Sequence, residues 1–212
     1  MLALTSFVEK IAMKLTILVC VGIAVLPAAV RAQAPASPTI LAPAQQIAAA
    51  VLALPQEFRA DARVLGYQAG RRELVSLREG KGPFTCLASD PVAQQFHVAC
   101  YHQSLEPFMA RGRELRASGV MGERVDTVRF AEVRARKLAM PTHAAALYSL
   151  SGAPDAYDAA TNTVRNARSL YVIYMPGATA ASTGVSTRPA AGTPWLMFPG
   201  TPKAHIMFQP RM

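Results

Sequence analysis

Hydrophobic residues follow three different patterns along the chain. Residues 15–26 form an uninterrupted apolar segment. Between residues 43 and 54, apolar side chains recur every three or four positions, as they do on one face of an α-helix. From Ala62 onward they alternate with polar residues, which is typical of half-buried strands. The chain therefore predicts an apolar leader, then a helix that stops at Pro55, then a series of short strands.

We expect four short strands in this series, at 62–67, 73–79, 83–89 and 96–102. Turn-forming residues separate them, at Ala69-Gly70, Gly80-Lys81-Gly82 and Asp90-Pro91. Because these connections are short, each strand should pair with the next one along the chain. The pattern predicts a four-strand antiparallel meander.

Two helices are predicted after the fourth strand. The first begins at Ser104, whose hydroxyl is suited to cap a helix, and ends at Gly119. The second covers residues 123–139 and ends before Pro141. Its basic side chains fall outside its apolar positions, so we expect them to be exposed: Arg124, Arg129, Arg134, Arg136 and Lys137.

The last third of the chain returns to strands. They are predicted at 144–149, 169–175, 195–198 and 204–208. Residues 176–194 are Pro, Gly, Ala, Ser or Thr, with the exceptions of Val185 and Arg188, and this composition predicts a flexible loop.

Strands, helices and strands in succession, without regular β-α alternation, indicate an α+β fold. We expect an antiparallel sheet, made of the four-strand meander and the C-terminal strands, packed against two or three helices. The expected domain organisation is one globular domain over 43–212.

The uninterrupted apolar segment has the form of a secretory signal peptide, with a charged residue before it and a proline and small residues after it. We expect residues 1–32 to be removed and residues 33–42 to form a flexible lead-in, with Met13 as an alternative start of translation. The segment is shorter than the roughly 20 residues that a membrane span needs. The sequence thus predicts an exported protein, periplasmic or secreted, without a transmembrane segment.

The net charge of the full chain is +9, from 22 Lys and Arg against 13 Asp and Glu. Loss of residues 1–32 removes three basic groups and one acidic group, which leaves +7. The remaining excess is spread along the chain and forms no basic tail or arm. We therefore expect no nucleic-acid partner, and name anionic components of the cell envelope as the partners that this charge favours.

Cys86 and Cys100 lie on the third and fourth predicted strands and are the only cysteines after residue 32. An even number of cysteines in an oxidising compartment favours a disulfide. A metal site that adds His97 and His102 is the alternative. Strand alternation opposes it, because Cys100 and His102 share one face whereas His97 points to the other. The disulfide is the favoured interpretation, and no cofactor is predicted.

Known catalytic motifs are absent from the sequence. It contains no Gly-x-Ser-x-Gly elbow, no phosphate-binding glycine loop and no His-Glu-x-x-His helix. Candidate catalytic side chains are therefore those that can transfer protons at neutral pH: His97, His102, Glu106 and His143. Two of these residues together in one concave pocket with perturbed pKa values, or one of them there with Tyr101 or His205, would favour an enzyme.

The segments 193–198 and 201–208 are predicted to be the two arms of a hairpin. If Met197 pairs with His205, one face carries four side chains: Trp195, Met197, His205 and Met207. Imidazole and thioether ligands suit Cu(I), and this set is similar to the Cu(I) site of small periplasmic copper chaperones. The resemblance covers these residues alone. The alternative is that Met and Trp fill the core of a terminal hairpin.

These observations favour an exported, non-catalytic binding or interaction module. Two alternatives remain at this point. One is a periplasmic copper-binding protein that uses the His-x-Met hairpin. The other is a hydrolase-type enzyme whose catalytic groups are brought together by the fold rather than by a sequence motif.

Export predicts a defined N-terminus. N-terminal sequencing of the exported protein is expected to begin at Gln33, because cleavage after Ala32 leaves small residues at the positions that signal peptidases require. A mature protein that still begins at Met1 or Met13 would contradict the prediction.

Overall fold

The computed structural model of the protein describes residues 40–190 and 192–210. The predicted signal peptide and residues 33–39 of the predicted lead-in lie outside the described residues. Within the described part, no helix is both long and apolar enough to cross a membrane.

The helices and strands that the sequence predicts are all present in the predicted order, together with two short helices and two short strands that it does not predict. The helices are α1 (Pro43–Ala50), α2 (Gln56–Arg59), α3 (Glu106–Ala117), α4 (Glu123–Arg134) and α5 (Ala180–Thr183), with 3-10 turns η1 (Val51–Ala53) and η2 (Gln103–Leu105). The strands are β1 (Arg63–Gly66), β2 (Val75–Arg78), β3 (Phe84–Leu87), β4 (Phe96–His102), β5 (Ala145–Gly152), β6 (Tyr157–Asp158), β7 (Thr163–Val164), β8 (Arg168–Tyr174), β9 (Trp195–Met197) and β10 (His205–Phe208).

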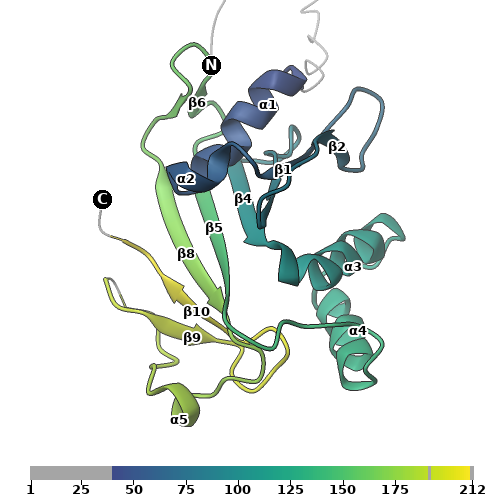
Figure 1. The fold of residues 1–212 in the computed structure, drawn as a ribbon, viewed down its shortest axis with the longest axis vertical. Coiled ribbons are helices and arrows are strands. Elements are labelled where there is room, and N and C mark those ends of the chain that lie inside the picture. The colour runs from purple at the N-terminus through teal and green to yellow at the C-terminus, as the bar shows by residue number, and fades with distance from the viewer. Residues whose placement is uncertain (1–39, 191, 211–212) are drawn as a thin grey trace, which may run out of the picture. The chain divides into compact units, whose positions relative to one another are not determined.

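Eight of the strands form one mixed, mostly antiparallel sheet in the order β2-β1-β3-β4-β5-β8-β10-β9, and β6 pairs with β7. The first helical segment covers one end of this sheet: α1 lies against β1 and β4 (Figure 1), and η1 contacts β4 and β5. The α+β prediction is confirmed.

The first four strands do not form a simple meander. β1 pairs antiparallel with β2 but parallel with β3, so the chain crosses from one side of β1 to the other. The predicted meander is wrong at this step. The crossing is close: a Cβ at Gly80 would lie 2.3 Å from the backbone nitrogen of Arg63, and the N–H of Gly82 donates to the carbonyl of Asp61 at 2.8 Å. Only a glycine allows the chain to pass so near to the start of β1.

One row of paired residues runs across the sheet from β1 to β10. Its members point to the same face and are Val64, Cys86, Cys100, Tyr148, Tyr171 and Phe208. At the β1 end, Ala50, Val51 and Leu54 of the first helical segment cover this face and form the core. At the other end the row is open, with Tyr171 39% and Phe208 37% exposed.

Cys86 and Cys100 are directly opposite each other on β3 and β4 and form a disulfide. Both residues are fully buried. The predicted disulfide is confirmed, and the alternative in which these cysteines bind a metal is wrong, because neither sulfur is available as a thiolate.

A buried glutamine joins α1 to the end of β1. The side-chain amide of Gln46 donates to the carbonyls of Leu41 and Tyr67 at 2.8 and 2.9 Å, and its oxygen accepts from the N–H of Tyr67 at 2.8 Å. The Gln46 side chain thus pairs with the backbone N–H and carbonyl of Tyr67, as a neighbouring strand would. A Cβ at Gly66 would lie 2.5 Å from the Gln46 oxygen, so the contact also requires the neighbouring glycine.

The ends of the two predicted helices differ from expectation. His102, rather than Ser104, caps the 3-10 turn η2 that leads into α3, because its side chain accepts from the N–H of Ser104, and α3 itself has no side-chain cap. The second helix, α4, ends at Arg134, and Arg136 has a positive φ of 58° that no helix continues through.

Arg129 is buried, against the prediction of an exposed side chain. It is 4% exposed. Its guanidinium lies 3.8 Å from the ring centroid of Phe108, donates to the Phe108 carbonyl at 3.0 Å and forms an ion pair with Asp126. The packing of α4 against α3 buries the Arg129 side chain. The hydrophobic pattern of α4 cannot predict this contact, because Phe108 belongs to the other helix.

The segment 176–194 contains more regular structure than its composition suggests. Thr179 caps the short helix α5, and Gly184 follows it in the left-handed conformation. The N–H of Leu196 donates to the carbonyl of Ser186 at 2.8 Å, and Ala178 packs against Leu196. These contacts hold the described parts of the segment against the C-terminal hairpin.

Reduction of the disulfide is expected to lower the free energy of unfolding by about 3 kcal/mol, because a cross-link over this sequence separation restricts the unfolded chain. Urea denaturation with and without reductant measures the difference. A Cys86→Ser/Cys100→Ser double variant is the control and should not respond to reductant. Two free thiols in the unfolded, unreduced protein would contradict the assignment.

Candidate functional site

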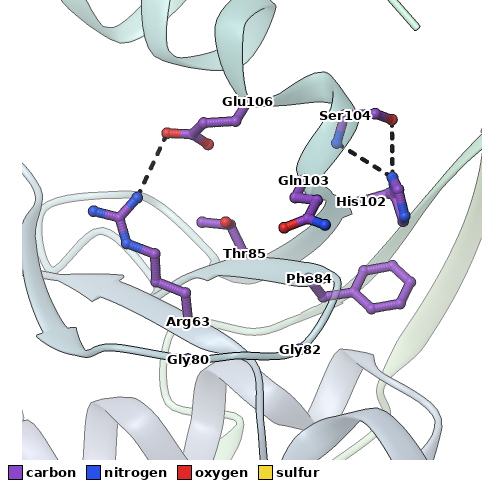
Figure 2. Close-up of a pocket in the computed structure, with 9 residues that line it drawn as sticks. All are labelled: Arg63, Gly80, Gly82, Phe84, Thr85, His102, Gln103, Ser104 and Glu106. Atoms are coloured by element: carbon purple, nitrogen blue, oxygen red, sulfur yellow. Dashed lines mark hydrogen bonds and ion pairs between the residues drawn. The ribbon is translucent and has the colours of Figure 1, made fainter.

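A pocket of about 480 Å³ lies where β1, β3 and the end of β4 meet the start of α3. Figure 2 shows the nine residues that line it. Six of them have polar side chains: Arg63, Thr85, His102, Gln103, Ser104 and Glu106. The pocket thus combines a cation, a carboxylate and several neutral hydrogen-bonding groups.

The turn from β4 into α3 brings these groups together. Tyr101 and His102 end β4 and point to opposite faces of the sheet, because successive residues of a strand alternate. The 3-10 turn η2 follows at once and leads into the first residue of α3, Glu106. The junction therefore places groups from a strand and from a helix within a few residues of each other.

A carboxylate at this junction is fully engaged by its neighbours. The buried hydroxyl of Tyr101 donates to Oε2 of Glu106 at 2.5 Å. Arg113, two turns along α3, donates to Oε1 of Glu106 at 2.7 Å and to the Tyr101 hydroxyl at 2.8 Å. Burial and the hydrogen bond to Glu106 raise the pKa of Tyr101 far above its usual value, so the hydroxyl stays protonated.

Arg63 is less well paired than Arg113. Its nearest guanidinium nitrogen is 3.9 Å from Oε1 of Glu106, an oxygen that Arg113 already holds. Its Nε is buried, forms no hydrogen bond within the described residues, and lies 3.5 Å from the exposed carboxylate of Glu79. Water screens such an exposed partner. The positive charge of Arg63 is therefore only partly offset.

Two neutral polar side chains stand between Arg63 and His102. Figure 2 shows Thr85 and Gln103 in this position, with their polar ends in the pocket. In the described part of the chain, the Thr85 hydroxyl and the Gln103 side-chain amide have no hydrogen-bonding partner. They are free to donate to, or accept from, a molecule in the pocket.

His102 and Ser104 form a local pair on the far side. The hydroxyl of Ser104 lies 2.8 Å from Nδ1 of His102, and the N–H of Ser104 donates to the same nitrogen at 3.2 Å. Nδ1 is therefore the acceptor, and the ring proton belongs on Nε2. Among the residues that the structure describes, no carboxylate contacts His102, so the pair lacks the group that orients a catalytic histidine in hydrolase triads.

The structure brings two of the candidate catalytic residues, His102 and Glu106, into the pocket and leaves the other two outside it. His97 is exposed on β4 beside Ser151, and His143 is exposed in the loop before β5 beside Thr142. Sequence reasoning missed Arg63 and Arg113. No motif links either of them to Glu106, and Arg63 reaches it only through the parallel pairing of β1 with β3.

The C-terminal hairpin has the register that the copper hypothesis requires. Met197 pairs with His205, and Trp195 pairs with Met207. The four side chains therefore point to one face of β9 and β10. Within the described ranges, no three His, Cys, Asp or Glu side chains lie close enough together to hold a metal ion.

Tyr101→Phe is expected to lower the free energy of unfolding by about 1–2 kcal/mol, because Glu106 and Arg113 each lose a hydrogen-bonding partner in a half-buried cluster. Urea denaturation measures the change. Tyr171→Phe, on the exposed part of the sheet, is the matched control and should leave stability unchanged. Equal stability of both variants would show that the cluster does not hold α3 to the sheet.

Comparisons with protein-family models, with curated proteins and with solved structures found no match for this chain. The proposals below therefore rest on the geometry of the chain itself.

Proposed function

We propose that this chain is an exported, non-catalytic binding module whose pocket receives a small polar molecule with an anionic group. The observation that carries the proposal is Arg63, a partly offset cation beside two unpaired neutral donors, Thr85 and Gln103. An arginine fork with adjacent neutral donors is suited to a carboxylate or a phosphate.

The state of the two proton-transfer candidates favours binding over catalysis. Both oxygens of Glu106 accept hydrogen bonds, from Tyr101 and Arg113. Nδ1 of His102 caps the turn into α3. Each group is committed to holding the junction of β4 and α3, and each would have to break these bonds to move a proton.

The size of the pocket supports a small ligand. A volume of about 480 Å³ is within the range of small-molecule sites. The ionic contact supplies attraction, and the neutral groups supply orientation. A polymer could present such a group at its end, so anionic components of the cell envelope remain the partners that we propose.

An exported location supports the same proposal. The apolar leader and the two cysteines point to an oxidising compartment, where a periplasmic or secreted binding module meets small anions and envelope components. The location and the partner are both part of the proposal.

Arg63→Gln is expected to weaken the binding of acetate or inorganic phosphate by about tenfold or more, because a hydrogen bond to a charged group is lost. Amide shifts of Thr85 and Gln103 in an NMR titration measure the affinity. Arg72→Gln, at an exposed position outside the pocket, is the control and should bind as the unmodified protein does.

Saturable shifts at Thr85 and Gln103 that Arg63→Gln removes would support the proposal. If neither anion causes shifts there, or if both arginine variants bind equally, the pocket is not an anion site and the proposal fails.

A further inference from the structure

The face of the C-terminal hairpin offers one nitrogen and two sulfur atoms from three neighbouring positions. His205 and Met197 are directly opposite each other on β10 and β9, and Met207 is two residues beyond His205 on the same face. Opposed side chains of an antiparallel pair have Cβ atoms about 5 Å apart, and diagonal ones about 7–8 Å. The long, flexible methionine side chain spans such distances.

His205 presents a ring nitrogen that the protein does not use. The ring is 6% exposed, and its Nδ1 lies 2.7 Å from the carbonyl of Lys203. A carbonyl only accepts, so Nδ1 carries the proton and Nε2 carries the lone pair. Over the described ranges, Nε2 has no hydrogen-bonding partner. The rings of Tyr174 and Phe198, with centroids 5.0 and 5.7 Å away, restrict the orientation of the imidazole.

A metal-binding histidine commonly donates its other ring N–H to a backbone carbonyl, as His205 does to Lys203. The nearby ammonium of Lys203 does not compete for the site, because it lies 2.8 Å from a carboxylate oxygen of Asp126. A neutral imidazole is the form that binds a metal.

Met197, Met207 and Trp195 are neither buried nor fully exposed. Met207 packs against Tyr174 and Val172, whereas no core cluster of the described residues includes Met197 or Trp195. The two thioethers thus lie on the same face as the histidine, Met197 on the edge strand β9 and Met207 on β10 beside the core.

We propose that Met197, His205 and Met207 bind Cu(I), with Trp195 beside the ion. Thioether and imidazole ligands are soft or intermediate donors and select Cu(I) over hard cations. No carboxylate takes part in the set, which disfavours calcium and magnesium. The site shares no residue with the Arg63 pocket, so copper binding goes beyond the proposed anion binding and does not depend on it.

Trp195 provides the measurement, since it is the only tryptophan in the chain. The mature, disulfide-bonded protein is titrated with Cu(I) in the presence of ascorbate, and with Ag(I) as a soft ion that does not change its oxidation state. We expect the fluorescence of Trp195 to be quenched at about one equivalent of either ion. Zn(II) should cause no comparable change.

Met197→Leu and Met207→Leu are expected to weaken Cu(I) binding by about tenfold or more each, because loss of even an outer-shell partner commonly has that effect. Both substitutions keep the side-chain volume, so the fold should survive. Met121→Leu, at a position that is 67% exposed and outside the proposed ligand set, is the matched control and should bind as the unmodified protein does. Arg63→Gln should also bind Cu(I) normally, which separates this proposal from the previous one.

Absence of quenching together with absence of copper after dialysis would overturn the inference. Equal Cu(I) affinity of the unmodified protein and of a Met197→Leu/Met207→Leu double variant would overturn it as well. In either case the methionines have only a packing role in the hairpin.

Discussion

The bond from the Tyr101 hydroxyl to Glu106 joins the end of β4 to the first residue of α3 at a distance of 2.5 Å. Arg113 closes the cluster by donating to both partners. A half-buried carboxylate is stabilised by such partners, because burial makes an unpaired charge unfavourable. Since Arg113 satisfies Glu106, the remaining guanidinium at the junction, Arg63, is left with an incomplete partner. The chemistry of the pocket therefore follows from the way in which one carboxylate is satisfied.

Local patterns predicted the features that depend on neighbouring residues. Alternation located the strands, and the same alternation placed Cys86 opposite Cys100. Non-local contacts explain the errors. The parallel pairing of β1 and β3 depends on the close passage of Gly80 across the backbone of Arg63. The burial of Arg129 depends on Phe108, a residue of another helix.

The same difference between local patterns and non-local contacts decides which residues of the candidate site could be predicted. His102 and Glu106 could be named from the sequence because their side chains belong to the types that transfer protons. Arg63 could not, because its contact with the junction of β4 and α3 requires the crossing of the chain between β2 and β3. The C-terminal hairpin is different: its two strands are separated by one short turn, so a register could be stated in advance, and the structure has that register.

The buried contact between Gln46 and the end of β1 also restricts how the sequence can vary. A side chain at position 66 would enter the space of the Gln46 amide oxygen, and a shorter residue at position 46 would leave the backbone of Tyr67 unpaired. A Cβ at position 66 would also lie 2.4 Å from Cδ1 of Leu77, so two neighbours restrict this position to glycine. Divergent sequences of this fold should therefore keep glycine at position 66 wherever glutamine stands at position 46, and this pair of residues can identify distant relatives that overall similarity does not reveal.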